Sequence, residues 1–240
     1  MTAPIGTSPI CFAFKASEIA SCINCSSFVI ARLSFHVFLK DIEVNILSQS
    51  FKGGLDLPKQ QKALLIIDMI NNFDFEMGHV LAEKTEQMTN KILALKQHAF
   101  KKNWPIIYIN DHYGLWKADI KAVMETCKNE RSAPILEQMA PSKDDYFLIK
   151  PKHSAFYGTA LETLLNELGV QDLILTGIAG NICVLFTAND AYMREYNLTV
   201  PKDCIASNDD RDNEYALTMM ENVLLAKITT TKEITDENQT

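Results

Sequence analysis

Short apolar runs alternate with helical patterns from residue 61 onward, and this alternation limits the fold more than any other feature of the chain. The run Lys62-Ala-Leu-Leu-Ile-Ile-Asp68 is apolar until it ends in a carboxylate, which is typical of a parallel strand covered on both faces. Residues 83–102 repeat apolar side chains at spacings of three and four, which indicates an amphipathic helix. Further strands are predicted at residues 104–110, 145–150, 172–177, 197–200 and 227–231, and further helices at 159–168, 181–195 and 214–226.

Strands that alternate with helices need right-handed crossover connections. We therefore predict an α/β fold with three α-β-α layers and a mostly parallel, Rossmann-like sheet of about six strands. The chain has 240 residues, of which 47% are hydrophobic, and this is enough to bury a sizeable core. Its formal net charge of -7 gives no basic footprint for nucleic acid or for a membrane surface, so we predict neither as a partner.

The first sixty residues differ from the rest of the chain. They carry five basic and four acidic residues, whereas the remainder carries eighteen and twenty-six, and their apolar residues follow no sustained period. We predict an N-terminal extension at 1–60, poorly structured or of unknown role, an α/β domain at 61–232 and a flexible tail at 233–240. Residues 51–58 resemble a linker. Cys11, Cys22, Cys25 and His36 include one Cys-x-x-Cys pair, but the other two are loosely spaced, so we favour a plain extension over a zinc site.

Six scattered cysteines without a dense disulfide spacing indicate reduced thiols, so we predict a cytoplasmic protein. The stretch from Met1 to Pro9 is uncharged and so lacks the positively charged start of a signal peptide. The apolar region near Phe28 is interrupted by polar residues and is a poor candidate for a membrane span. The Ser-rich, acid-poor composition of residues 1–60 leaves an organellar transit peptide open as an alternative.

Three predicted strand ends carry groups that can do chemistry. Asp68 ends the first strand, Lys150 ends the third, and Cys183 follows the fourth strand after a glycine-bearing turn. Open parallel sheets bind ligands beyond the carboxyl ends of their strands, so the topology is expected to bring these three side chains together.

A carboxylate, an ammonium and a thiol suit acyl transfer to sulfur. A free thiol has a pKa of about 8.5 and attacks only as thiolate; a helix start and the nearby Lys150 ammonium would favour the thiolate. Asp68 could take the thiol proton and return it to a leaving amine, while backbone N–H groups held the oxyanion. Blander explanations stay open at this point: Cys183 as a small buried residue, Asp68 as a helix cap and Lys150 as a solvated charge.

Four stretches, taken together, resemble the isochorismatase-like cysteine hydrolase superfamily, which includes nicotinamidases and N-carbamoylsarcosine amidases. The stretches are residues 63–73, 149–159, 175–187 and 203–207. The resemblance implies that Asp68 is the general base and acid, that Lys150 is the electrostatic partner of the thiolate, and that Cys183 is the nucleophile. It also implies a cis peptide between Ile178 and Ala179, with the N–H groups of Ala179 and Cys183 as the oxyanion hole.

Two departures from the family pattern concern the substrate and a metal. Asn71-Asn72 stands where an acidic residue is frequent, which puts local packing and substrate contacts in doubt. Nicotinamidases of the superfamily commonly bind a metal through an Asp and several His, but here Asp111-His112 stands without a further His before His153. We therefore predict no metal and no cofactor.

Aromatic residues and histidines near the strand ends are candidate substrate contacts, with core or rim packing as the alternative for each aromatic residue. The candidates are Phe73, His112, Trp116, His153, Phe156 and Tyr157. The sequence does not predict the substrate itself, because the pocket is shaped by the predicted loops 69–82 and 111–145, which carry no recognisable motif.

Three functions remain at this stage. The cysteine favours hydrolysis of a small amide or carbamoyl C–N bond through a thioester. The alternatives are isochorismatase-type ether hydrolysis, which does not depend on a thiol, and a non-catalytic homo-oligomeric module that binds a small metabolite. A small-molecule amide substrate and self-association are the partner predictions.

Overall fold

Seven parallel strands form one sheet in the part of the chain that the computed structural model describes, residues 61–236. The order across the sheet is β3 (Tyr146–Lys150), β2 (Ile106–Asp111), β1 (Gln61–Ile67), β4 (Val170–Ile178), β5 (Asn197–Pro201) and β7 (Lys227–Thr229), while the short β6 (Ile205–Ala206) pairs with β4. The predicted extension 1–60, with its linker, zinc-site and targeting alternatives, lies outside the described residues.

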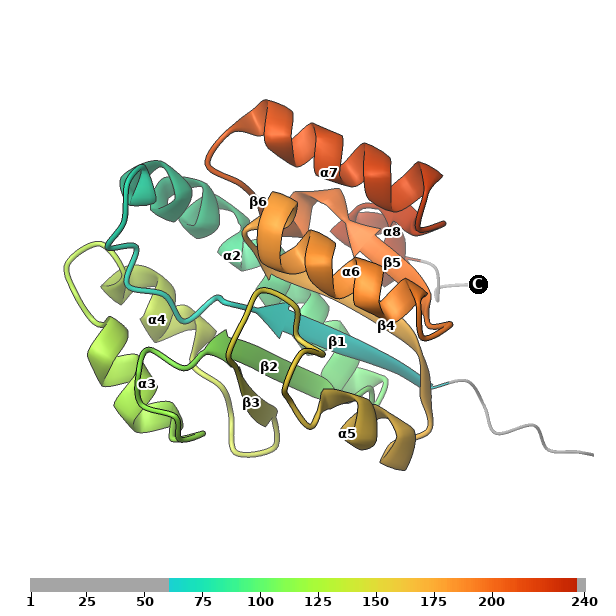
Figure 1. Ribbon diagram of the computed structural model, residues 1–240, viewed down its shortest axis with the longest axis horizontal. Helices are drawn as coiled ribbons and strands as arrows, with labels where there is room; N and C mark the ends of the chain where they lie inside the picture. Colours follow the sequence, from blue (N-terminus) through green and yellow to red (C-terminus); the bar gives the residue numbers. More distant parts are fainter. Residues whose placement is uncertain (1–60, 237–240) are drawn as a thin grey trace, which may run out of the picture. The chain divides into compact units, whose positions relative to one another are not determined.

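Helices cover both faces of the sheet, which confirms the predicted three-layer α/β fold (Figure 1). One face packs against α2 (Gly78–Lys101), α4 (Ala133–Met139) and α8 (Thr231–Asp236). The other face packs against α5 (Leu161–Glu167), α6 (Leu185–Tyr192) and α7 (Asp210–Asn222). The helix α3 (Ile120–Cys127) belongs to a smaller cluster with Ile70 and Leu136.

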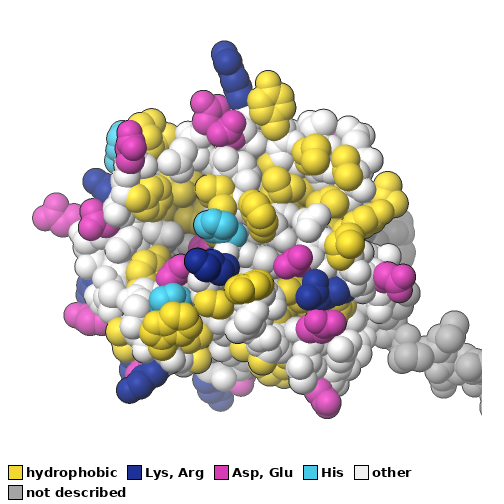
Figure 2. Space-filling model, viewed as in Figure 1, with side chains coloured by type: hydrophobic (Ala, Val, Ile, Leu, Met, Phe, Trp, Pro, Cys, Tyr) yellow, Lys and Arg dark blue, Asp and Glu magenta, His cyan; other side chains and the backbone are white. Residues whose placement is uncertain are grey.

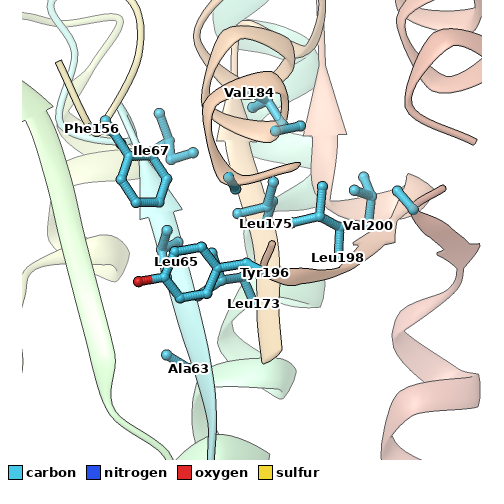
Figure 3. Close-up of a cluster of buried hydrophobic side chains, with 14 of the residues drawn as sticks. Ala63, Leu65, Ile67, Phe156, Leu173, Leu175, Val184, Tyr196, Leu198 and Val200 are labelled. Atoms are coloured by element: carbon cyan, nitrogen blue, oxygen red, sulfur yellow. The ribbon is translucent and has the colours of Figure 1, made fainter. Parts of the chain in front are cut away.

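The continuously apolar sequence of β1 is explained by its central place in the sheet. Leu64 and Ile66 contribute to the core on the α2 side, whereas Ala63, Leu65 and Ile67 contribute to the core on the α6 side. Figure 3 shows the second set between the sheet and the turn that leads into α6. Each of these five side chains is at most 1% exposed, so both faces of β1 are buried.

The strand order creates a switch point between β1 and β4. The chain runs outward from β1 to β2 and β3, then returns to place β4 on the other side of β1 before continuing to β5 and β7. Connections on either side of the switch point diverge, which leaves space beyond the carboxyl ends of β1 and β4. The topology therefore places the ends of the strands that carry Asp68 and Cys183 next to each other.

Several element boundaries differ from the predictions for local physical reasons. The stretch 111–145 was predicted as a loop but contains α3, capped by the Asp119 side chain, and α4. The helix predicted to begin at 181 starts as a π-helical turn, Gly180–Val184, before α6. The tail predicted to be flexible from residue 233 is helical to Asp236, because Ile234 is buried in the core on the α2 side.

The surface seen in Figure 2 carries acidic and basic side chains interspersed, and hydrophobic side chains gather over α6 and α7. Exposed residues of these helices and their ends include Phe186, Met193, Tyr215 and Met219. None of the helices within residues 61–236 is both long enough and apolar enough to span a membrane.

Candidate functional site

Asp68 and Lys150 form a buried ion pair across three strands. Asp68 directly follows β1 and Lys150 is the last residue of β3, and the Lys150 Nζ lies 2.8 Å from the Asp68 Oδ2. The two side chains are 8% and 2% exposed. The backbone N–H of Asp111, at the end of the intervening β2, donates to the Asp68 Oδ1 at 2.9 Å. The sheet itself thus sets the positions of both charges.

Cys183 lies beside the same ammonium group and is also within hydrogen-bond reach of the Asp68 carboxylate. The Lys150 Nζ donates to the Cys183 Sγ at 3.5 Å and to the Lys152 carbonyl at 3.1 Å. Its three donor positions therefore meet a carboxylate, a sulfur and a carbonyl oxygen. The structure brings together the three side chains that the sequence placed at separate strand ends.

The turn that carries Cys183 is held from both sides. It begins after the peptide bond between Ile178 and Ala179, which is cis, and the Ala179 carbonyl accepts from the Val184 N–H at 3.1 Å in the π-helical turn. The Thr187 hydroxyl donates to the Cys183 carbonyl at 2.7 Å and accepts from the Ala155 N–H at 3.0 Å. The turn is thereby tied to the segment that follows β3.

Glycines stand before this turn, at Gly177, and at its first residue, Gly180, where other parts of the chain come close. Gly177 has a φ of 115°, and a Cβ at this position would collide with the Ile67 carbonyl on the neighbouring strand. A Cβ at Gly180 would collide with the Asn213 side-chain oxygen. The neighbouring backbone and the positive φ therefore require glycine at 177, whereas a side chain at 180 would displace the Asn213 amide.

A buried amide fixes the backbone that carries Asp68. The Asn110 side chain is fully buried; its Oδ1 accepts from the Ile70 N–H at 3.1 Å and its Nδ2 donates to the Ile70 carbonyl at 2.6 Å. This pair of bonds holds the chain just after Asp68, whose φ of 52° is uncommon for a residue with a Cβ. The sequence analysis did not single out Asn110, although a polar residue inside an apolar strand was a usable signal.

The protonation balance of the site corrects the expectation of a preformed thiolate. Burial raises the pKa of the Cys183 thiol to about 12, and the negative charge of Asp68 adds to this, while Lys150 opposes it. Burial also raises the pKa of Asp68 against the effect of Lys150. Burial disfavours the charged form of Lys150, but Asp68 and Cys183 outweigh it and raise the pKa of Lys150.

A cavity of about 380 Å³ opens at the carboxyl ends of β1 and β4 beside these groups. Its lining includes Asp68 and Cys183 themselves, the end of β4 and the start of α7. The sequence analysis missed seven of the lining residues, most of which stand on loops or at helix starts without a distinctive motif: Asn71, Phe75, Leu81, Asn181, Ile182, Asn208 and Asp212.

His153 is the one predicted substrate contact that lines this cavity. Its Nδ1 lies 4.0 Å from the Cys183 Sγ, and its ring is tilted against Phe186 with 5.7 Å between centroids. Phe73 is instead fully buried in the core on the α2 side. Phe156 points into the core on the α6 side, near Ile67 (Figure 3).

The other predicted contacts lie away from the cavity lining. His112 and Trp116 stack on each other with ring centroids 4.0 Å apart, and Trp116 is 67% exposed. Tyr157 is 62% exposed and also lies outside the lining. Aromatic character near a strand end was therefore a poor indicator of a place in the cavity.

Asp111 and His112 are engaged in the local turn. The Asp111 Oδ1 accepts from the Tyr113 N–H at 2.8 Å, and the His112 Nδ1 accepts from the Gly114 N–H at 2.9 Å. Within residues 61–236, no three side chains of His, Cys, Asp or Glu converge as ligands for a metal.

Residues 62–233 match the family model described as the isochorismatase domain. An uncharacterized isochorismatase family protein, YaaI of Bacillus subtilis (strain 168), is 67% identical over 181 residues, which are 75% of this chain and all of that protein. The crystal structure of nicotinamidase PncA from Bacillus subtilis covers 70% of this chain and 99% of its own, with a TM-score of 0.56 and 27% identity. The structure of N-carbamoylsarcosine amidase from Thermoplasma acidophilum covers 72% of this chain and 98% of its own, with a TM-score of 0.56 and 24% identity. At this level of identity the likeness shows a shared fold alone.

Proposed function

Because this chain belongs to the isochorismatase family of hydrolases, we propose that it hydrolyses a small amide or carbamoyl C–N bond through a thioester on Cys183. The observation that carries the proposal is the Lys150 ammonium, which contacts both the Asp68 carboxylate and the Cys183 sulfur at the edge of a cavity. The likeness to a nicotinamidase, whose name states cleavage of an amide, supports the same bond type.

The proton balance suggests how the thiol becomes reactive. Burial raises the pKa of the Cys183 thiol, and the charge of Asp68 raises it further, because ionising the thiol alone would leave the buried trio with a net negative charge. Transfer of the thiol proton to Asp68 keeps the net charge of the trio at zero, and the raised pKa of Asp68 favours this transfer. Lys150 then faces the thiolate instead of a carboxylate. The nucleophile forms by internal proton transfer rather than by loss of a proton to solvent.

The remaining steps use the same groups twice. The thiolate attacks the amide carbonyl carbon, and the N–H groups of Ala179 and Cys183 hold the resulting oxyanion. Protonated Asp68 donates its proton to the departing amine as the C–N bond breaks, which leaves the thioester. A water molecule, deprotonated by Asp68, then attacks the thioester, and the acid product leaves as the sulfur recovers the proton.

Ammonia release tests this proposal. A panel of small amides and carbamoyl compounds is incubated with the full chain and with Cys183→Ala, and ammonia is quantified. The proposal expects release that depends on Cys183. Equal rates in both proteins would reject the thioester route, and hydrolysis of isochorismate by both proteins would favour the ether-cleaving alternative.

A non-catalytic metabolite-binding role makes a different prediction. It expects compounds from the panel to raise the melting temperature of the protein without any turnover. Self-association and a cytoplasmic location also stay predictions. Size-exclusion chromatography with light scattering tests the first, and fractionation of cells that express the full chain, residues 1–60 included, tests the second.

A further inference from the structure

We propose, resting on the function above, that the cavity selects amides whose acyl part is neutral or cationic, and that Asp212 is the residue that rejects acyl parts bearing a carboxylate. The substrate class is thus a small amide with a hydrogen-bond donor or ammonium group remote from the scissile bond. An N-carbamoyl amino acid, which carries a carboxylate there, falls outside this class.

The cavity wall is acidic rather than basic. Its lining contains two carboxylates, Asp68 and Asp212, and no Lys or Arg. The charge of Asp68 is balanced by Lys150 at 2.8 Å. Within residues 61–236, Asp212 has no basic side chain within salt-bridge distance, and the adjacent Arg211 is not part of the lining. One acidic charge is therefore left to act on whatever enters.

The position of Asp212 relative to Cys183 is built into the fold. Asn181 stands two residues before Cys183 in the π-helical turn, and its Nδ2 donates to the Asp212 Oδ2 at 3.4 Å. The Asn181 backbone N–H donates to the Ser207 hydroxyl at 3.0 Å, and this hydroxyl donates to the Asn213 Oδ1 at 2.8 Å. These bonds join the turn of the nucleophile to the first turn of α7, where Asp212 lies.

The helix does not need Asp212 for its start. Asp209 is the N-cap of α7, and its Oδ1 accepts from the Arg211 N–H at 2.7 Å. Asp210 supplies a further acidic group in the first turn and pairs with Lys84 at 2.6 Å, outside the cavity.

Removal of Asp210 would leave Lys84 unpaired beside the Asn208 carbonyl, which it also contacts at 3.0 Å. Glu214 is therefore the matched control: it is an acidic residue of the same helix, forms no salt bridge within residues 61–236 and lies outside the cavity lining.

The rest of the wall is neutral and fits a ligand of small size. Asn71, Asn181 and Asn208 contribute amides, which can both donate and accept hydrogen bonds, beside the apolar Phe75 and Ile182. A volume of about 380 Å³ is at the lower end of the range for small-molecule sites. The wall thus offers one acidic group and several neutral polar groups around an apolar patch.

Charged thiol reagents test this without a known substrate. The full chain is treated with cationic, neutral and anionic methanethiosulfonates, in which the Cys183 sulfur displaces methanesulfinate and forms a mixed disulfide. Modification of the Cys183 peptide is followed by mass spectrometry, which separates it from the other cysteines. Because every reagent needs the same thiolate, the ratio of cationic to anionic rates reports the charge of the cavity.

We expect the cationic reagent to be favoured in the wild type, and Asp212→Asn to lower the ratio about three- to tenfold, as for a nearby, partly solvated charge. Glu214→Gln should leave the ratio within about twofold, and high salt should weaken the preference. An anionic or absent preference in the wild type, equal effects of the two variants, or a Cys183 that no reagent reaches would each overturn the proposal.

Turnover separates this inference from the proposed function. If amides are hydrolysed in a Cys183-dependent way but carboxylate-bearing ones are preferred, the selectivity fails and the function stands. If ammonia release does not depend on Cys183, the function fails, while the reagent ratios still decide the charge of the cavity.

Discussion

The ends of β1, β3 and β4 and the loop that follows β2 lie at the same edge of the sheet, yet they use their conspicuous residues differently. At the ends of β1 and β3 and in the turn that follows β4, the Asp68 carboxylate and the Cys183 sulfur lie 2.8 and 3.5 Å from the Lys150 ammonium group. In the loop after β2, His112 and Trp116 stack on each other outside the cavity lining. Strand ends have positions set by the hydrogen-bonded sheet, whereas a loop residue is free to find the nearest favourable contact.

The difference predicts that chemistry depends on the strand-end residues and very little on the aromatic loop. The largest expected effect is that of Cys183→Ala, which should lower kcat for amide hydrolysis at least about 10³-fold, because it removes the nucleophile. Cys204→Ala is the matched control: this thiol is fully buried, its burial raises its pKa to about 12, and it contacts Thr231 rather than the cavity. A similar loss in both variants would break the distinction.

Lys150→Met tests the buried ion pair. Removing the ammonium leaves the Asp68 carboxylate buried without its partner, and we expect a loss of about 3–5 kcal/mol in the free energy of unfolding. The double variant Lys150→Met with Asp68→Asn should recover much of that stability without recovering activity. Urea denaturation gives the first result and ammonia release the second. A fully stable single variant would contradict the burial and pairing described here.

Phe156→Ala and Trp116→Ala sharpen the contrast between core and loop aromatics. Phe156 is 6% exposed and packs in the core beside Tyr196, so its truncation should cost about 3–5 kcal/mol of stability. Truncation of the exposed Trp116 should change stability by less than about 0.5 kcal/mol. Denaturant midpoints of the two variants decide the matter, and a reversed order would show that the two aromatics had been assigned to the wrong environments.

Asp68→Asn should make the Cys183 thiol more acidic even as it abolishes hydrolysis. The negative charge of Asp68 raises the thiol pKa, so its removal lowers that pKa from about 12. Iodoacetamide labelling of the Cys183 peptide should then rise and level off at a lower pH in the variant than in the wild type. Labelling that shifts to higher pH would reverse the sign of the interaction.

The smallest expected effect is that of metal removal. Asp111 and His112 are occupied by backbone N–H groups of their own turn, so prolonged treatment with EDTA should change the hydrolytic rate less than about twofold. Zinc restored to the treated protein should not raise the rate. A rate that falls with chelation and returns with zinc would contradict the predicted absence of a metal.

The sequence predicted the layers, most of the strands and the convergence of the trio. The spacing of apolar residues and the reactive side chains at strand ends are visible locally in the sequence, and a parallel sheet places those strand ends at one edge. The sequence did not predict the short elements α3, α4 and β6, and for Phe156 it gave core packing only as the alternative to substrate contact. It also predicted an acidic thiol from Lys150 and the helix start, whereas burial and the charge of Asp68 dominate the pKa of Cys183. Burial and neighbouring charge depend on tertiary contacts that spacing along the chain does not reveal.

The central claim is that the Cys183 sulfur becomes covalently acylated when Asp68 takes its proton. The direct measurement is acid quenching of the full chain during turnover of an amide, followed by mass spectrometry of the peptide that contains Cys183. The account predicts an added acyl mass on this peptide, sensitive to hydroxylamine and missing in Asp68→Asn. Steady turnover with an unmodified Cys183 peptide, and with Cys183→Ala equally active, would contradict it.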